Sequence, residues 1–162
     1  MGLPREKNIL KSIGFTFLEL VIVMALIAIV AGIAYPSFQK YAINARLKAA
    51  ARDIMGDFGN AKALAAADSQ NRDYEVVFNQ GNNTYSLRPV GGSIILTKSP
   101  ANFASDIRIG PNAPNFGGVP VVNFSTRGTC TAGTVDLINA RGSKAEITTT
   151  ITGRTYVEFD LK

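Results

Sequence analysis

The chain has 162 residues, of which 46% are apolar and 18% are charged, and its formal net charge is +5 at pH 7. This composition excludes an intrinsically disordered chain, and the length suits one domain with an appendage. With no histidine and a single cysteine, Cys130, the chain cannot build a histidine-based catalytic triad, a histidine metal site, a CxxC motif or an intramolecular disulfide.

The basic excess is distributed unevenly along the chain. Residues 1–14 carry a net charge of +2, residues 15–67 carry +2 and residues 68–162 carry only +1. A positive charge attracts nucleic acids and anionic membranes. Because the C-terminal part is nearly neutral, the net charge does not indicate a large nucleic-acid surface there.

An apolar segment lies near the N-terminus. Between Phe15 and Tyr35, 18 of 21 residues are apolar. A helix of this length spans the roughly 30 Å hydrocarbon core of a bilayer, and the basic residues before it are expected on the cytoplasmic side. A cleaved signal peptide has a shorter apolar region and a small-residue cleavage site, so a membrane anchor is the better alternative.

Glu19 is the fifth residue of this apolar segment. A carboxylate at such a depth costs about 2.5–3.5 kcal/mol and needs a partner. No basic residue lies between Lys11 and Lys40, so no side chain at helical spacing supplies one. The partner is therefore expected to be a chain terminus or a group on another subunit.

Residues 11–23, Lys-Ser-Ile-Gly-Phe-Thr-Phe-Leu-Glu-Leu-Val-Ile-Val, resemble the signal of type IV prepilins and type II secretion pseudopilins. Phe17 and Leu18 stand where leucine and isoleucine are commonest in that family. The resemblance implies that a prepilin peptidase cuts between Gly14 and Phe15, removes residues 1–14 and methylates the new amine on Phe15. It also implies that Glu19 pairs with the N-terminal amine of a neighbouring pilin or pseudopilin during assembly.

A helix is expected over residues 15–67, with its membrane-spanning part at 15–35. Pro36 predicts a kink or a helix end just outside the bilayer, because proline removes a backbone hydrogen bond. Further on, apolar residues recur at helical spacing and predict the face that docks a globular head, whereas the charged residues, Asp53 and Asp57 among them, are expected on other faces. The apolar stripe consists of Ile43, Leu47, Ala50, Ile54, Phe58, Ala61 and Leu64.

Residues 68–162 read as a β-rich periplasmic head. Short apolar runs alternate with glycine, asparagine and proline, which is typical of antiparallel strands. The expected fold class is α+β: a pilin-like fold in which the long N-terminal helix packs on an antiparallel β head. A long loop is expected over 99–120, broken by one short strand, and the strands are expected at 74–79, 84–88, 93–98, 107–109, 121–125, 133–139, 145–151 and 155–161.

The C-terminal part narrows the resemblance. Residues 123–128, 133–137 and 147–154 resemble the GspH/FimT branch, which comprises H-type pseudopilins of type II secretion and related minor pilins. The resemblance implies a structural subunit of a pseudopilus or a type IV pilus. Such a subunit is anchored once in the bacterial inner membrane, contacts its lipid and places its head in the periplasm.

Some FimT-type members bind DNA during natural transformation through a C-terminal Gly-Arg-x-Arg motif. Here the matching positions are Gly153, Arg154, Thr155 and Tyr156, so tyrosine replaces the second arginine. Arg127 and Arg141 join Arg154 in a DNA site only if the fold brings their loops together. The alternative is a hairpin turn with an exposed arginine, and DNA is therefore the less favoured partner.

No residue pattern supports an enzyme. The chain lacks histidine, a nucleophile motif and a recognisable cluster of paired carboxylates. Cys130 is expected to be a buried thiol, with an intermolecular disulfide as the alternative in an oxidising periplasm. The chain is expected to be a substrate of the peptidase, not a catalyst, and to need no cofactor or metal.

Overall fold

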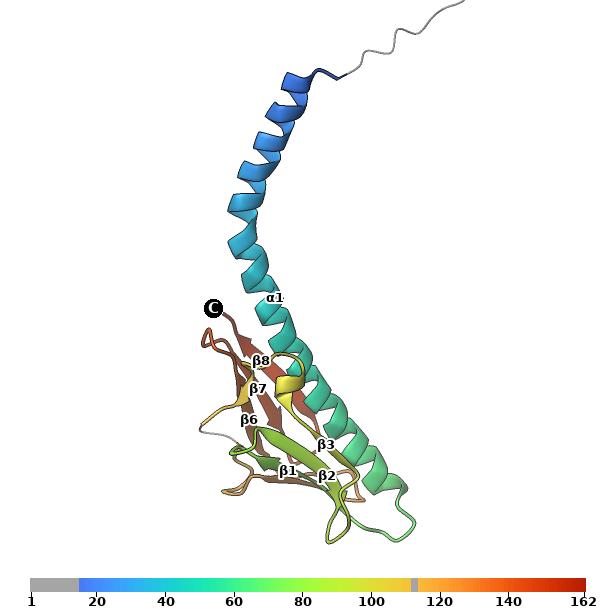
Figure 1. The fold of residues 1–162 in the computed structure, drawn as a ribbon. Helices are drawn as coiled ribbons and strands as arrows, with labels where there is room; N and C mark the ends of the chain where they lie inside the picture. Colours follow the sequence, from blue (N-terminus) through green and yellow to red (C-terminus); the bar gives the residue numbers. More distant parts are fainter. Residues whose placement is uncertain (1–14, 112–113) are drawn as a thin grey trace, which may run out of the picture. The chain divides into compact units, whose positions relative to one another are not determined.

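A computed structural model describes residues 15–111 and 114–162 (Figure 1). The chain divides into two compact units, of which the first ends at Gln39 and the second runs from Lys40 to Lys162. One helix, α1 (Phe17–Ala67), contributes residues to both units. The expected leader, with Gly14 at its cleavage site, lies outside the described residues.

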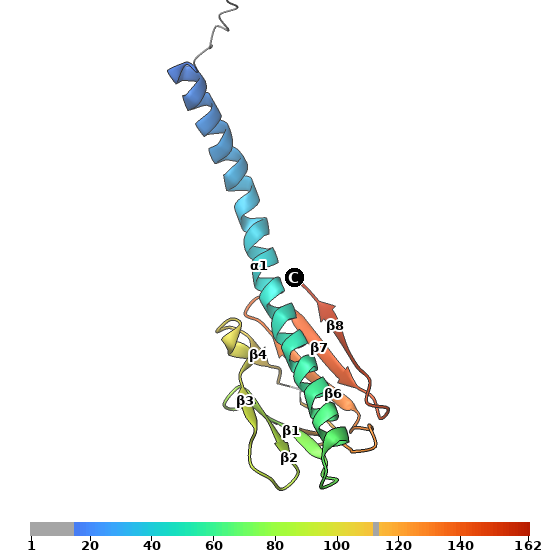
Figure 2. The ribbon, with the colours of Figure 1, turned by 90° about the vertical axis from the view of Figure 1, so that its right-hand side faces the viewer.

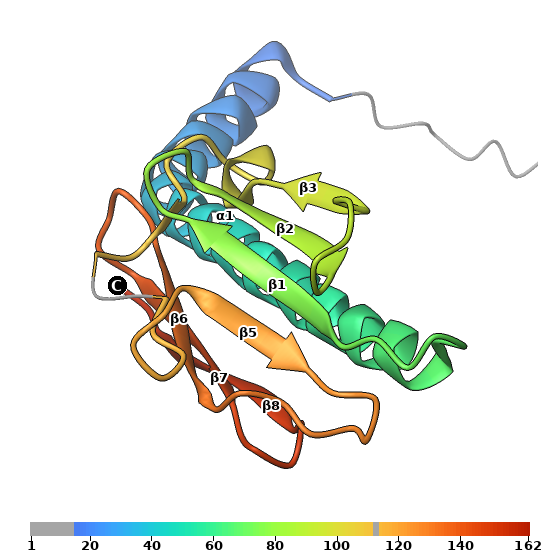
Figure 3. The ribbon, with the colours of Figure 1, turned by 90° about the horizontal axis from the view of Figure 1, so that it is seen from below.

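Among its described residues, the second unit contains two antiparallel sheets of four strands each. The strands are β1 (Tyr74–Asn79), β2 (Thr84–Pro89), β3 (Leu96–Lys98), β4 (Arg108–Ile109), β5 (Val121–Phe124), β6 (Gly133–Ile138), β7 (Lys144–Thr149) and β8 (Thr155–Asp160). The first sheet has the order β3-β2-β1-β5 and the second β4-β6-β7-β8. Figure 2 shows the later part of α1 with β1–β3 on one side and β7 and β8 on the other, and Figure 3 shows β1 and β2 running beside α1. The expected α+β pilin-like fold is confirmed.

Aromatic rings fill the centre of the head. Phe58 of α1 contacts Phe78, Phe116 and Phe124, with ring centroids 6.1, 6.4 and 5.6 Å apart. All four rings are buried, and aromatic pairs at these separations add about 0.5–1.5 kcal/mol each to the burial of their apolar area. The aromatic part of the core therefore lies where α1, β1, β5 and the loop before β5 meet, and the core continues into buried apolar residues of β2, β6 and β7.

Most of the expected elements are present with bounds shifted by one to three residues. The helix ends at Ala67 as expected, and the hairpins β1–β2, β6–β7 and β7–β8 are confirmed. The third strand begins at Leu96, not at residue 93, because its pairing with β2 begins with Leu96 opposite Leu87. The chain before it first makes a turn at Pro89–Gly92, in which the Gly92 N–H donates to the Pro89 carbonyl. The loop from 99 to 120 also contains the 3₁₀ helix η1 (Pro100–Asn102) as well as the short strand β4.

The docking face of α1 differs from the expected stripe at several positions. Leu64 is 37% exposed, and Ala65 is buried in its place. Ala51 is also buried, and Ile43 is only half-buried. Asp57, expected on an outer face, is only 3% exposed and lies on the docking face. A helical face defined by spacing alone can shift by one residue because 3.6 residues make a turn, and Asp57 lies beside Phe58 in the chain.

A polar network ties the end of α1 to β1. The Asp68 carboxylate accepts hydrogen bonds from Arg72 Nη2 at 2.9 Å, from the Tyr74 hydroxyl at 2.9 Å and from the Gln70 N–H at 2.7 Å. The hydrogen bond from Arg72 contributes most to lowering the pKa of Asp68 to about 2. Because this pKa lies below its ordinary value of about 3.9, the stabilisation is complete above pH 4 and is lost as the pH falls towards 2.

Candidate functional site

The start of α1 carries the expected assembly residues. Thr16 precedes the helix, and its Oγ1 accepts a hydrogen bond from the Glu19 N–H at 3.2 Å. Threonine followed three residues later by glutamate is the pattern of a capping box, and an acid in the first turn also complements the helix dipole. Thr16 therefore caps the helix, and the Glu19 carboxylate stands in the first turn, where the helix dipole favours a negative charge.

The Glu19 side chain is exposed. Within residues 15–111 and 114–162, its carboxylate has no hydrogen-bond or ion-pair partner, and Phe15 is 83% exposed. From Phe17 onward this part of α1 exposes apolar side chains such as Ile27 and Ile33, which are 62% and 75% exposed. Such a surface is costly for an isolated chain in water and calls for an apolar surrounding. In that surrounding the Glu19 carboxylate needs a cation.

Among the described residues, α1 is the one helix long and apolar enough to cross a membrane, a finding that rests on length and composition. No residue in its most apolar window is buried, so the segment is not the core helix of the head. Pro36 lies inside this helix, which continues through it. A helix end at Pro36 is therefore wrong, whereas a kink there stays a prediction.

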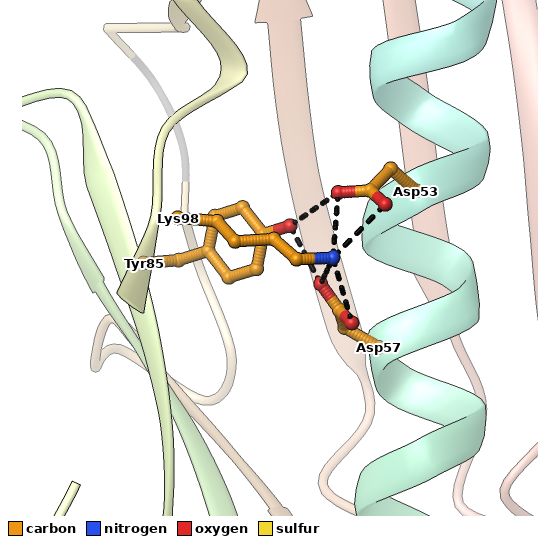
Figure 4. Close-up of polar contacts among 4 residues, drawn as sticks. All are labelled: Asp53, Asp57, Tyr85 and Lys98. Carbon is orange, nitrogen blue, oxygen red and sulfur yellow. Dashed lines mark hydrogen bonds and ion pairs between the residues drawn. The ribbon is translucent and has the colours of Figure 1, made fainter. Parts of the chain in front are cut away.

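A polar cluster joins α1 to the first sheet (Figure 4). Asp53 and Asp57, one helical turn apart on α1, both face Lys98 of β3, whose Nζ lies 2.9 Å from an oxygen of each carboxylate. The Tyr85 hydroxyl of β2 donates towards the same pair, at 2.7 Å from Asp57 Oδ2 and 3.0 Å from Asp53 Oδ2. The expected absence of paired carboxylates is therefore wrong.

The contacts within the cluster keep the Tyr85 hydroxyl protonated and the Lys98 ammonium charged. Burial, and after it the hydrogen bond to Asp57, raises the pKa of Tyr85 far above its ordinary value, so the hydroxyl stays protonated and donates. Partial burial by itself lowers the pKa of Lys98, but the hydrogen bonds to Asp57 and Asp53 outweigh it and raise the pKa overall. Both carboxylates are already bound to Lys98, so the arrangement fits a structural link between helix and sheet better than an acid–base pair.

The structure separates Arg141 from the other two arginines proposed as DNA contacts. The loop at 125–129 carries Arg127, and the loop at 150–154 carries Arg154. These two loops are in contact, because a Cβ added at Gly153 would collide with the Gly128 carbonyl oxygen. Gly153 has a φ of +72°, which suits glycine, and its carbonyl accepts a hydrogen bond from Lys62 Nζ at 3.3 Å. Lys62 was not expected here, because its contact depends on the packing of α1 against a loop that is distant in the sequence.

Arg141 lies at the other end of the second sheet. It belongs to the turn before β7, whereas Arg154 belongs to the turn after β7. A strand of six residues is about 20 Å long, so one compact site cannot contain both side chains. The fold thus brings together the loops that carry Arg127 and Arg154, and it places Arg141 at the far end of β7.

The Cys130 thiol is buried, in line with the sequence expectation. The side chain is 7% exposed, and its sulfur lies 3.1 Å from the Thr150 carbonyl oxygen. Burial raises the pKa of the Cys130 thiol, so it is a poor nucleophile and a poor disulfide partner in this conformation. In the part of the chain that the structure describes, no three histidine, cysteine, aspartate or glutamate side chains gather as metal ligands.

Comparison with known proteins gives one finding. Residues 10–35 match the family described as the prokaryotic N-terminal methylation motif, a span that includes Gly14, Phe15 and Glu19. No curated protein and no solved structure matches the chain significantly. The motif implies processing by a prepilin peptidase. Together with the exposed apolar helix and the α+β fold, it indicates a type IV pilin-like protein whose N-terminal helix suits an anchor in the inner membrane.

Proposed function

We propose that the protein is a minor pilin or pseudopilin of the GspH/FimT branch, a structural subunit of a type II secretion pseudopilus or a type IV pilus. It crosses the inner membrane once, with its head in the periplasm. The peptidase cuts between Gly14 and Phe15 and methylates Phe15. Glu19 then pairs with the amine of a neighbouring subunit as the filament grows.

One observation carries this proposal: an exposed apolar helix begins within the methylation motif, and the carboxylate in its first turn has no partner among the residues that the structure describes. A plain membrane anchor gains nothing from such a charge, because an acid in the hydrocarbon region opposes insertion. An assembling subunit gains a directional contact, since an ion pair in an apolar surrounding is strong when both members are present.

Processing and assembly can be measured in the native host. We expect the mature chain to begin at Phe15 with one added methyl group, as read by mass spectrometry of the membrane fraction. In a strain without prepilin peptidase the full leader should remain, and the chain should be missing from sheared filaments. An unprocessed but filament-incorporated chain would contradict the proposal.

A DNA-binding minor pilin is the second candidate function. The observation that favours it is the meeting of the 125–129 and 150–154 loops, which places Arg127, Arg154 and Lys62 in one region of the head. Tyr156, where the motif of the DNA-binding members has its second arginine, is 46% exposed and lines a pocket of about 350 Å³ with Arg154. Arginine contacts to phosphate release counterions, and an exposed tyrosine ring can stack on a base.

This second candidate predicts salt-dependent DNA binding that requires Arg127 and Arg154. The double variant Arg127→Ala/Arg154→Ala should weaken a gel shift at least about tenfold and lower the slope of log affinity against log salt by about 2. Arg141→Ala removes an arginine at the opposite end of β7 and should leave binding unchanged. Failure of the unmodified chain to shift DNA at low salt rejects this function.

A further inference from the structure

A pocket opens on the head between α1 and the residues that follow β8. Its volume is about 310 Å³. Lys48 and Arg52 supply positive charge and Asn44 an amide, whereas no acidic side chain lines it. The lining residues are Tyr41, Asn44, Ala45, Lys48, Arg52 and Leu161.

The pocket is built by contacts between distant parts of the chain. Asn44 Nδ2 donates to the Lys162 carbonyl at 3.2 Å, and the Ser143 hydroxyl donates to Asn44 Oδ1 at 2.9 Å. The Lys162 N–H in turn donates to Ser143 Oγ at 3.0 Å. This closed network holds the wall formed by Leu161 against α1, so the cavity exists before any ligand binds.

The two cations of the pocket are not used elsewhere in the head. Across the described ranges, neither Lys48 nor Arg52 forms an ion pair, and Lys48 Nζ lies 5.7 Å from the centre of the Phe159 ring. The acids nearest in the chain, Asp53 and Asp57, are already bound to Lys98. A pair of uncompensated cations in a preformed cavity favours an anionic ligand, and the aromatic ring helps to hold Lys48 in place.

The position of this pocket in the chain indicates which anion is available. From residue 40 to residue 52 the chain has four basic residues and no acid, and this stretch begins five residues after Tyr35, where the apolar segment ends. Tyr41 is 73% exposed, as is typical of aromatic side chains at a membrane interface. Lys48 follows Tyr35 by thirteen residues, about 20 Å of helix, and basic side chains on a helix lean towards its N-terminus, which here means towards the apolar segment.

We propose that this pocket binds the phosphate group of an anionic phospholipid. The inference rests on the proposed membrane anchoring, because the anchor presents lipid headgroups to the residues that follow it. Lys48 and Arg52 contact the phosphate, Asn44 donates to a headgroup oxygen, and Leu161 covers the glycerol backbone. A short pocket with two cations suits a single headgroup, whereas DNA would require positive charge along an extended path.

The test uses the purified full chain in a neutral detergent and measures bound lipid by native mass spectrometry. We expect phosphatidylglycerol to bind at least about tenfold more tightly than phosphatidylcholine with the same acyl chains. The variant Lys48→Gln/Arg52→Gln should lose this preference. The control Arg46→Gln/Arg108→Gln removes two exposed charges outside the pocket lining and should keep the preference.

Three outcomes would overturn the proposal. The first is equal binding of phosphatidylglycerol and phosphatidylcholine by the unmodified chain, and the second is loss of the preference for phosphatidylglycerol to the same extent in both double variants. The third outcome is displacement of the bound lipid by an equal concentration of inorganic phosphate. Equal loss would indicate diffuse charge attraction, and displacement by phosphate would indicate a simple anion site. Co-flotation with pure phosphatidylcholine vesicles separates this inference from the proposed function. A chain that floats without preferring phosphatidylglycerol contradicts only the lipid pocket, whereas a chain that does not float contradicts the membrane anchoring itself.

Discussion

Replacing Glu19 by alanine is expected to leave leader cleavage and membrane insertion intact and to reduce incorporation into filaments at least tenfold. The substitution removes a carboxylate that costs about 2.5–3.5 kcal/mol in the hydrocarbon region, so insertion becomes easier. The proposed assembly contact loses its only acidic member, and the amine of the neighbouring Phe15 is left unpaired in an apolar surrounding. Quantitative immunoblots of sheared filaments and of membranes measure the ratio of filament-incorporated chain to membrane-inserted chain.

Two further variants separate pairing from helix capping, because Glu19 also stands at the third position after the Thr16 cap. Glu19→Gln keeps a side chain that suits a capping box but loses the charge, so it should fail in assembly as alanine does. Thr16→Ala removes the cap, which costs about 1 kcal/mol at the helix start, and keeps the charge, so it should still assemble. Normal assembly of Glu19→Gln would show that capping, not charge, is what Glu19 supplies.

The local features of the fold could be predicted from the sequence. The end of α1 at Ala67 follows from the stop of helical spacing before Asp68, and each hairpin turn is marked by glycine or asparagine, as at Gln80–Asn83. The division of the strands into two sheets could not be predicted. It depends on β5 pairing with β1 across more than forty residues, and no local pattern specifies such a partner.

In the candidate sites, too, residues of a contiguous motif could be predicted from the sequence, whereas contacts between distant residues could not. The methylation motif is contiguous, so Gly14, Phe15 and Glu19 could be located by spacing. Lys98 lies 45 residues from Asp53, and Lys62 lies 91 residues from Gly153, so neither contact leaves a local signal. Charged residues on a helix are usually solvated, and this general preference led to the wrong expectation for Asp57.

Replacing Lys98 by methionine is expected to lower the free energy of unfolding of the head by about 3 kcal/mol. The substitution leaves Asp53 and Asp57 facing each other without a cation, and Asp57 is almost fully buried. This loss is at the lower end of the range expected when a buried ion pair is broken. The side chains of Lys98 and Asp53 are 28% and 31% exposed, so solvent weakens their interaction. For a unit of this size the midpoint of thermal unfolding should fall by roughly 12 °C.

Lys144→Met is the matched control, since Lys144 also lies between two acids, Asp136 and Glu146. Its side chain is 38% exposed and that of Glu146 is 41% exposed, so the loss should be about 1 kcal/mol or less. Thermal unfolding of the full chain in detergent compares the two variants, with the near-ultraviolet signal of the tyrosines as the readout.

Adding Asp57→Asn to Lys98→Met should recover part of the stability, because it removes the repulsion between the two carboxylates. Equal losses in the two lysine variants, or no recovery with asparagine, would mean that apolar packing and not this cluster holds α1 on the first sheet.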